Sequence, residues 1–138
     1  MANRDIYHEN VKAALVKDGW TITHDPFPLA YGNRKLFADL GAEKLFAAEK
    51  AERKIVIEVK SFIGPSQVAD LQEAIGAYEM YKNIMAEQQH ERVLYLAIPR
   101  DTYKGIFSEP LGQLMIAKEG LCLFVFDPKK ELIEQWIP

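Results

Sequence analysis

Three charged residues stand inside apolar segments of the sequence, where an ionised side chain is costly unless it is paired or bound to a ligand. Asp39 interrupts the apolar run at residues 36–40, and Glu58 and Lys60 interrupt the β-branched segment at residues 54–60. Side chains alternate along a strand, so Glu58 and Lys60 are expected on one face, about 6.6 Å apart. These three residues are the strongest candidates for chemistry in the chain.

If the strand of Asp39 lies beside the strand of Glu58, the two carboxylates form one acidic site. Carboxylates so close repel each other and raise a pKa unless a divalent cation neutralises them, and their hard oxygen ligands suit Mg²⁺ or Mn²⁺. Lys60 would then orient the attacking water or stabilise the transition state of phosphodiester hydrolysis. The alternative is a partly exposed ion pair between Glu58 and Lys60, with Asp39 as a turn residue before Gly41.

Hydrophobic periodicity and turn residues predict the elements that position these side chains. Helices are predicted at residues 4–17, 67–88 and 101–118, the last interrupted at Pro110. Strands are predicted at residues 20–23, 36–40, 54–60, 92–98, 121–126 and 132–137, the last as an edge strand, with a loop through Pro26 and Pro28. Residues 43–50 leave strand and short helix open. The order predicts a single α/β domain over residues 1–138, a small mixed sheet flanked by helices.

The charge balance limits how such a protein would meet DNA. The 138 residues hold 17 Lys and Arg against 20 Asp and Glu, a formal charge of −3, which excludes coating of nucleic acid by bulk electrostatics. We therefore expect contact through a confined patch, a homodimer or a more basic partner. The single cysteine, Cys122, the lack of a signal-like leader and the lack of a membrane-spanning apolar run predict a cytoplasmic protein without membrane contact.

The order of elements, together with Asp39 and Glu58-Val59-Lys60, resembles the PD-(D/E)XK nuclease superfamily. More closely, the chain resembles the XisH family of fdxN element excision controlling factors. The similar stretches are residues 18–26, 39–44, 58–62, 92–97, 125–128 and 136–138. The resemblance implies a restriction endonuclease-like core.

The superfamily resemblance implies roles for individual residues. Asp39, Glu58 and the backbone carbonyl of Val59 would bind the metal, and Lys60 would be the catalytic lysine. Resolvase-like members also place a glutamate on the first helix, about eleven residues before its terminal glycine, where this chain has His8. Imidazole is a legitimate Mn²⁺ ligand, so His8 is a further candidate; the alternative is a partly buried histidine bonded to a carbonyl.

Two further residues have supporting roles as candidates. Ser61 follows Lys60 and would hydrogen-bond a substrate phosphate, or it is a turn residue. Gln72, on the predicted second helix, would point toward the active face of the sheet, or it is an ordinary surface glutamine. A Gln-x-x-x-Tyr motif found in some superfamily members is absent, because alanines precede Tyr78 and Tyr81 at that spacing.

Two functions remain open from the sequence. The first is a metal-dependent endonuclease acting on DNA when an element is excised, with a homodimer supplying the two sites that duplex cleavage needs. The second is a non-catalytic accessory protein that uses the nuclease-like fold to bind DNA or a partner protein in recombination. The family resemblance implies an XisI-like partner and a site-specific recombinase.

Overall fold

A six-stranded mixed sheet forms the centre of the molecule in the computed structural model, which describes residues 4–46, 51–88 and 90–138. In spatial order its strands are β1 (Thr21–His24), β4 (Leu40–Phe46), β5 (Ala51–Val59), β6 (Val93–Pro99), β7 (Leu123–Asp127) and β8 (Leu132–Ile137). The central strands β5, β6 and β7 are parallel, and the outer strands pair antiparallel. β8 lies at the edge, as predicted.

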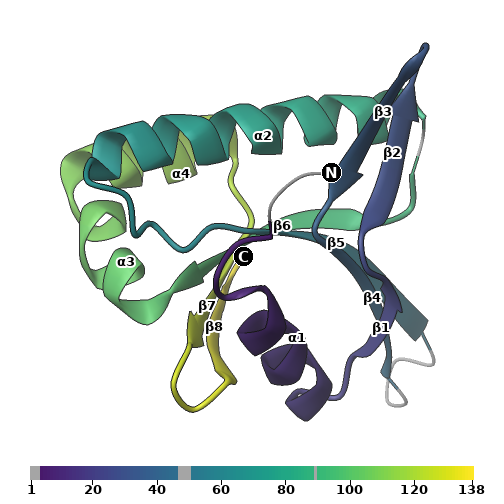
Figure 1. The fold of residues 1–138 in the computed structure, drawn as a ribbon, viewed down its shortest axis with the longest axis horizontal. Coiled ribbons are helices and arrows are strands. Elements are labelled where there is room, and N and C mark those ends of the chain that lie inside the picture. The colour runs from purple at the N-terminus through teal and green to yellow at the C-terminus, as the bar shows by residue number, and fades with distance from the viewer. Residues whose placement is uncertain (1–3, 47–50, 89) are drawn as a thin grey trace.

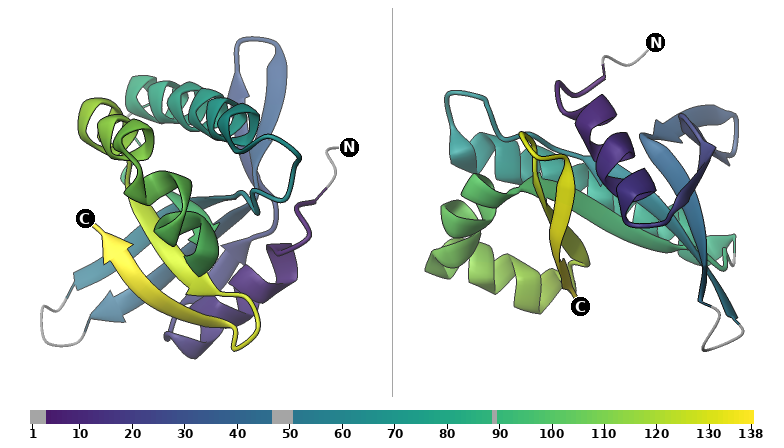
Figure 2. Two further views of the ribbon diagram at one scale, coloured as in Figure 1. Left: turned by 90° about the vertical axis from the view of Figure 1, so that its left-hand side faces the viewer. Right: turned by 90° about the horizontal axis from the view of Figure 1, so that it is seen from below.

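Helices cover both faces of this sheet (Figures 1 and 2). One face carries α1 (His8–Lys17), and the other carries α2 (Gln67–Glu87), α3 (Arg100–Lys104), the short 3-10 helix η1 (Ile106–Ser108) and α4 (Pro110–Glu119). Each layer has its own apolar cluster: Leu15 and Ile57 belong to the one under α1, Val56 and Tyr78 to the one under α2. The predicted mixed sheet with flanking helices is confirmed. No helix among the described residues has the length and apolar character needed to cross a bilayer.

The predicted loop through Pro26 and Pro28 is wrong, because β2 (Phe27–Tyr31) and β3 (Arg34–Ala38) form a hairpin there. Gly32 begins its two-residue turn with φ of 59°, a conformation that such hairpins favour and glycine allows. Proline is tolerated because both strands of a two-stranded ribbon are edges. The prediction failed because proline in a short segment reads as a loop when its pairing partner is not known.

Three predicted boundaries also change. The strand predicted at residues 36–40 is divided at Asp39, between the end of β3 and the start of β4. Residues 43–46 are strand, as part of β4, and residues 47–50 lie outside the described residues. Pro110 does not interrupt a helix but begins α4, since proline needs no N–H in a first helical turn.

Aromatic side chains gather on the α1 face of the sheet. The ring centroids of Trp20 and Trp136 are 5.6 Å apart, and Trp136 lies 5.0 Å from both Tyr95 and Phe124. Trp20 lies between α1 and β1, and Trp136 belongs to β8. The cluster therefore ties the end of α1 to the edge of the sheet.

Two glycines in helices should respond to alanine in opposite ways. At Gly112 on α4 a Cβ would fall against the Ile106 carbonyl oxygen and the Phe107 Cα, whereas at Gly76 on α2 it would meet open space. We expect Gly112→Ala to lower the free energy of unfolding by about 1–3 kcal/mol through overpacking. Gly76→Ala should raise it by about 0.5–1 kcal/mol because alanine favours helix. Urea unfolding measures both changes, and changes of equal sign would contradict this packing.

Candidate functional site

Asp39 and Glu58 lie side by side where the pairing of β4 with β5 begins. Leu40 is paired with Ile57, so the ladder places the preceding Asp39 beside Glu58. The N–H of Val59 donates a hydrogen bond of 2.7 Å to Asp39 Oδ2, and the negative charge of Asp39 acts on the neighbouring Glu58. The neighbouring strands that the sequence argument required are therefore present.

The two carboxyl groups are held where their ionised forms are disfavoured. Burial raises the pKa of Asp39, although the hydrogen bond from Val59 opposes the shift. Burial also raises the pKa of Glu58 well above its usual range, and the negative charge of Asp39 raises it further. Glu58 Oε1 is buried and has no hydrogen-bond partner among the described residues. The pair is therefore short of positive charge and of donors.

His8 stands at the start of α1 and is almost fully buried, with 2% of its surface exposed. Its Nε2 lies 2.8 Å from Asp25 Oδ1. Burial would raise the pKa of Asp25, but hydrogen bonds from Lys12 and His8 outweigh burial and lower it, so Asp25 is an ionised acceptor. The His8 Nε2 therefore carries a proton, and in the neutral ring Nδ1 has a bare lone pair.

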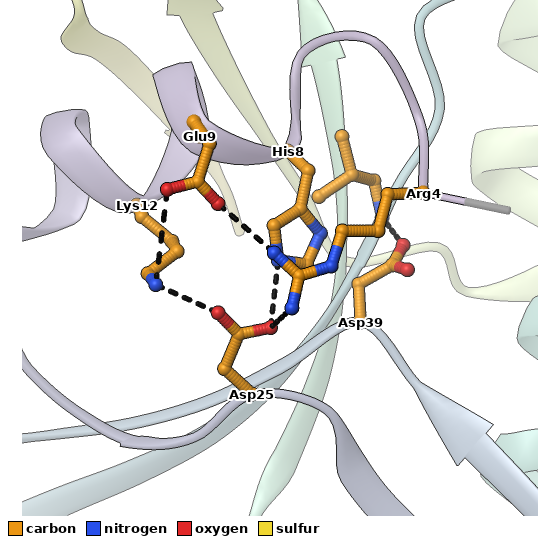
Figure 3. Close-up of polar contacts among 7 residues, drawn as sticks. Arg4, His8, Glu9, Lys12, Asp25 and Asp39 are labelled. Carbon is orange, nitrogen blue, oxygen red and sulfur yellow. Dashed lines mark hydrogen bonds and ion pairs between the residues drawn. The ribbon is translucent and has the colours of Figure 1, made fainter.

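The Nδ1 of His8 is the second unpartnered buried atom at this site. Figure 3 shows the imidazole between Asp25 and Asp39. A histidine that binds a metal commonly donates its other ring N–H to a carboxylate, as His8 does. However, within the described chain His8, Asp39 and Glu58 do not bring three ligand atoms within 4.8 Å of one another. His8 is near the pair but not preassembled with it.

The described residues with that compact spacing are His8, Glu9 and Asp25. Two cations already hold Asp25, since Lys12 Nζ lies 2.7 Å from Oδ2 and Arg4 Nη2 lies 3.3 Å from Oδ1. Glu9 is exposed and pairs with Arg4 at 3.2 Å. These residues form a charge-balanced salt-bridge network around the buried imidazole (Figure 3).

Asp5 is a third acidic group at the site, and the sequence pattern did not single it out. Its Oδ2 accepts a hydrogen bond of 2.8 Å from the N–H of Ser61, and its Oδ1 accepts one of 2.9 Å from the N–H of Tyr7. Its charge contributes to the raised pKa values of Asp39 and Glu58. The only local signal was an aspartate just before a helix, a common capping position, and its contact with Ser61 joins residues far apart in sequence.

Lys60 lies one residue beyond β5, and its side chain is directed to α2. Its Nζ is 3.1 Å from Glu73 Oε1 and 3.9 Å from Asp70 Oδ1. The strand predicted through Lys60 thus ends at Val59, and Lys60 pairs with α2 and not with Glu58, its partner in the alternative interpretation. Of the two supporting candidates, Ser61 is buried and held by Asp5, whereas Gln72 is exposed on α2.

Tyr81 of α2 closes another side of the site. Its hydroxyl donates a hydrogen bond of 3.1 Å to the carbonyl of Phe37, two residues before Asp39. Burial, together with the charges of Glu58 and Asp39, raises the pKa of Tyr81 to about 12. The hydroxyl therefore stays protonated at neutral pH, and the helix is fixed over the carboxyl pair.

A sequence profile described as XisH protein matches residues 1–134. The chain belongs to the XisH family. Two crystal structures are similar to this XisH-family chain. An XisH family protein from Nostoc punctiforme PCC 73102 is 38% identical, with 97% of this chain and 100% of that chain covered and a TM-score of 0.87. An fdxN element excision controlling factor protein from Anabaena variabilis is 37% identical, with 98% and 100% covered and a TM-score of 0.88. Among proteins with curated descriptions, none matches the chain.

The donor set of this XisH-family site fits a hard divalent cation. Two adjoining carboxyl groups with raised pKa values and an unpartnered oxygen, Glu58 Oε1, would gain from a neighbouring positive charge. Oxygen ligands that leave room for water suit Mg²⁺ or Mn²⁺. Without a cation, ionisation of these carboxyl groups lowers the stability of the folded state at neutral pH.

The unfavourable ionisation of buried Glu58 predicts that Glu58→Gln stabilises the protein by an amount that depends on pH. Because the folded pKa of Glu58 exceeds the unfolded value, the folded state binds the proton more tightly, so stability falls as pH rises from the unfolded pKa toward the folded pKa. In EDTA at pH 8 we expect the variant to raise Tm by about 3–5 °C, with a smaller gain at pH 5. Calorimetry with Glu52→Gln, an exposed position on the same strand, as the matched control tests this. An unchanged or lower Tm at pH 8 would contradict the buried-acid interpretation.

Proposed function

We propose that this XisH-family protein hydrolyses DNA phosphodiester bonds with a PD-(D/E)XK-like core in which Asp39 and Glu58 hold Mg²⁺ or Mn²⁺. The observation that carries the proposal is the adjoining carboxyl pair, with raised pKa values and a buried, unpartnered Glu58 Oε1. Perturbed pKa values arising from burial and a specific charged neighbour are typical of functional sites. A purely structural pair would be expected to have donors for its buried oxygens.

Each residue of the proposed site has its own role in hydrolysis. Asp39 is oriented by the Val59 N–H, and Asp39, Glu58 and the Val59 carbonyl would be the oxygen ligands, with His8 Nδ1 as a further ligand from α1. When bound, the ion would supply a Lewis acid for the phosphodiester and a water of lowered pKa. Lys60, released from its ion pairs with α2, would orient that water or stabilise transition-state charge.

The biological setting is proposed from the relatives. The similar protein from Anabaena variabilis is named an fdxN element excision controlling factor, and we extend this class of role to the present chain. We propose that it acts on DNA during excision of an element, together with an XisI-like partner and a site-specific recombinase. A homodimer would place two such sites on one duplex.

One observation favours a second function, that of a non-catalytic accessory protein. Lys60 Nζ lies 3.1 Å from Glu73 Oε1 and 3.9 Å from Asp70 Oδ1, so two carboxylates of α2 compete for the side chain that hydrolysis would need. A lysine with this pairing stabilises the packing of α2 on the sheet. Such a protein would keep the fold and bind DNA or a partner without cutting.

Metal binding is the first test of the proposed site. We expect Mn²⁺ to bind with one site per chain in isothermal titration calorimetry, and Asp39→Asn to weaken binding by about 10-fold or more because one of two charged ligands is lost. Glu52→Gln, which removes an exposed acid of the same strand as Glu58, should bind as the parent does. A folded parent protein that binds no Mn²⁺ would refute the metal site.

A DNA cleavage assay distinguishes the nuclease function from the accessory function. With Mg²⁺ or Mn²⁺ and supercoiled, branched or single-stranded DNA, we expect nicking that falls by about 100-fold or more in Lys60→Ala, while Mn²⁺ affinity is retained. The matched control is Lys54→Ala on the same strand, where the lysine pairs with Glu91 at 2.7 Å. If the folded parent binds Mn²⁺ yet leaves all three DNA forms intact, the accessory function is supported instead.

A further inference from the structure

The β2–β3 hairpin projects from the body of the protein. Figures 1 and 2 show its tip extending past α2, while its base lies against that helix. Leu29 is buried in the apolar cluster under α2, Gln88 donates a hydrogen bond to the Ala30 carbonyl, and Tyr81 donates one to the Phe37 carbonyl. The hairpin is therefore held against α2 as far as Ala30, and its exposed side chains beyond that helix can contact another molecule.

The hairpin differs from the rest of the chain in charge. Residues 26–38 contain Arg34 and Lys35 and no acidic residue, although the whole chain has a formal charge of −3. Both side chains are exposed, and neither forms an ion pair with any described residue. In contrast, Arg4, Lys12 and Lys60 are all paired with carboxylates. The hairpin therefore offers two cations, one on each face of the ribbon, that are available to an anionic partner.

Aromatic surface lies next to these cations. Tyr31 is 49% exposed and is paired across the hairpin with Arg34, and Phe37 is 48% exposed and is paired with Pro28. Cations beside exposed aromatic rings provide both phosphate contacts and apolar contacts to sugars and bases. Both kinds of contact match the surface of nucleic acid, so DNA is the partner that this surface favours.

We propose that the β2–β3 hairpin is a duplex DNA contact of this protein, with Arg34 and Lys35 binding backbone phosphates. This inference rests on the proposed function, because it takes DNA as the substrate. A two-stranded ribbon fits the major groove. The five residue-to-residue steps from Arg34 to Asp39 span about 17 Å along the strand, and a duplex rises about 3.4 Å per base pair. The hairpin would therefore hold DNA about five base pairs from the phosphate at Asp39.

Fluorescence anisotropy with a labelled duplex of about two helical turns tests the proposal without any metal, in EDTA. We expect the double variant Arg34→Ala, Lys35→Ala to bind about tenfold more weakly and to lower the slope of log Kd against log salt by about 2. The matched control is Lys104→Ala, Lys118→Ala, which removes two exposed cations from α3 and α4, outside the hairpin. The control should keep both affinity and slope.

The outcomes separate this proposal from the nuclease proposal. Equal losses in the hairpin and control variants, or a hairpin variant that binds like the parent, would overturn the hairpin contact even if the parent cleaves DNA. A parent that does not bind duplex would overturn it too, including the case in which the hairpin captures only a protein partner. Selective loss in the hairpin variant supports the contact even if no DNA is ever cut.

Discussion

The hydrogen bond from the Val59 N–H to Asp39 Oδ2 fastens the short connection between β3 and β4 to the end of β5. Because Leu40 is paired with Ile57, Glu58 lies beside the fixed Asp39. Burial then disfavours the charge of both carboxyl groups. The other elements of the site are arranged around this contact: the N-terminal segment with Asp5 and His8 on one side, and α2 on the other.

The sheet sustains this unfavourable contact because its centre is packed on both faces. Val56 faces the cluster under α2, Ile57 faces the cluster under α1, and neither is exposed. With both faces occupied, β5 cannot slip in register to relieve the repulsion, since a slip by one residue would exchange the two faces. Apolar burial in the same strand thus offsets the unfavourable free energy of the carboxyl pair. Such local destabilisation, compensated elsewhere in the fold, is common at functional sites.

Much of this arrangement is readable from residue patterns, and the exceptions have physical causes. Glu58 stands out because a charge within a β-branched run has to be explained, and the predicted strand and the long helix after it are both found. Lys60 shows the limit of that reasoning: alternation holds only while the strand continues, and β5 ends at Val59. The contact of Asp5 with Ser61 depends on how α1 docks, which no local pattern encodes. The roles of these residues in chemistry stay predictions.

The aromatic cluster on the α1 face has a practical consequence. Both tryptophans of the chain, Trp20 and Trp136, belong to it, with ring centroids 5.6 Å apart. Intrinsic emission from this protein therefore reports the docking of α1 on the sheet and receives no tryptophan signal from the α2 face. Since α1 also carries His8, a shift of the helix on adding a ligand would change this emission.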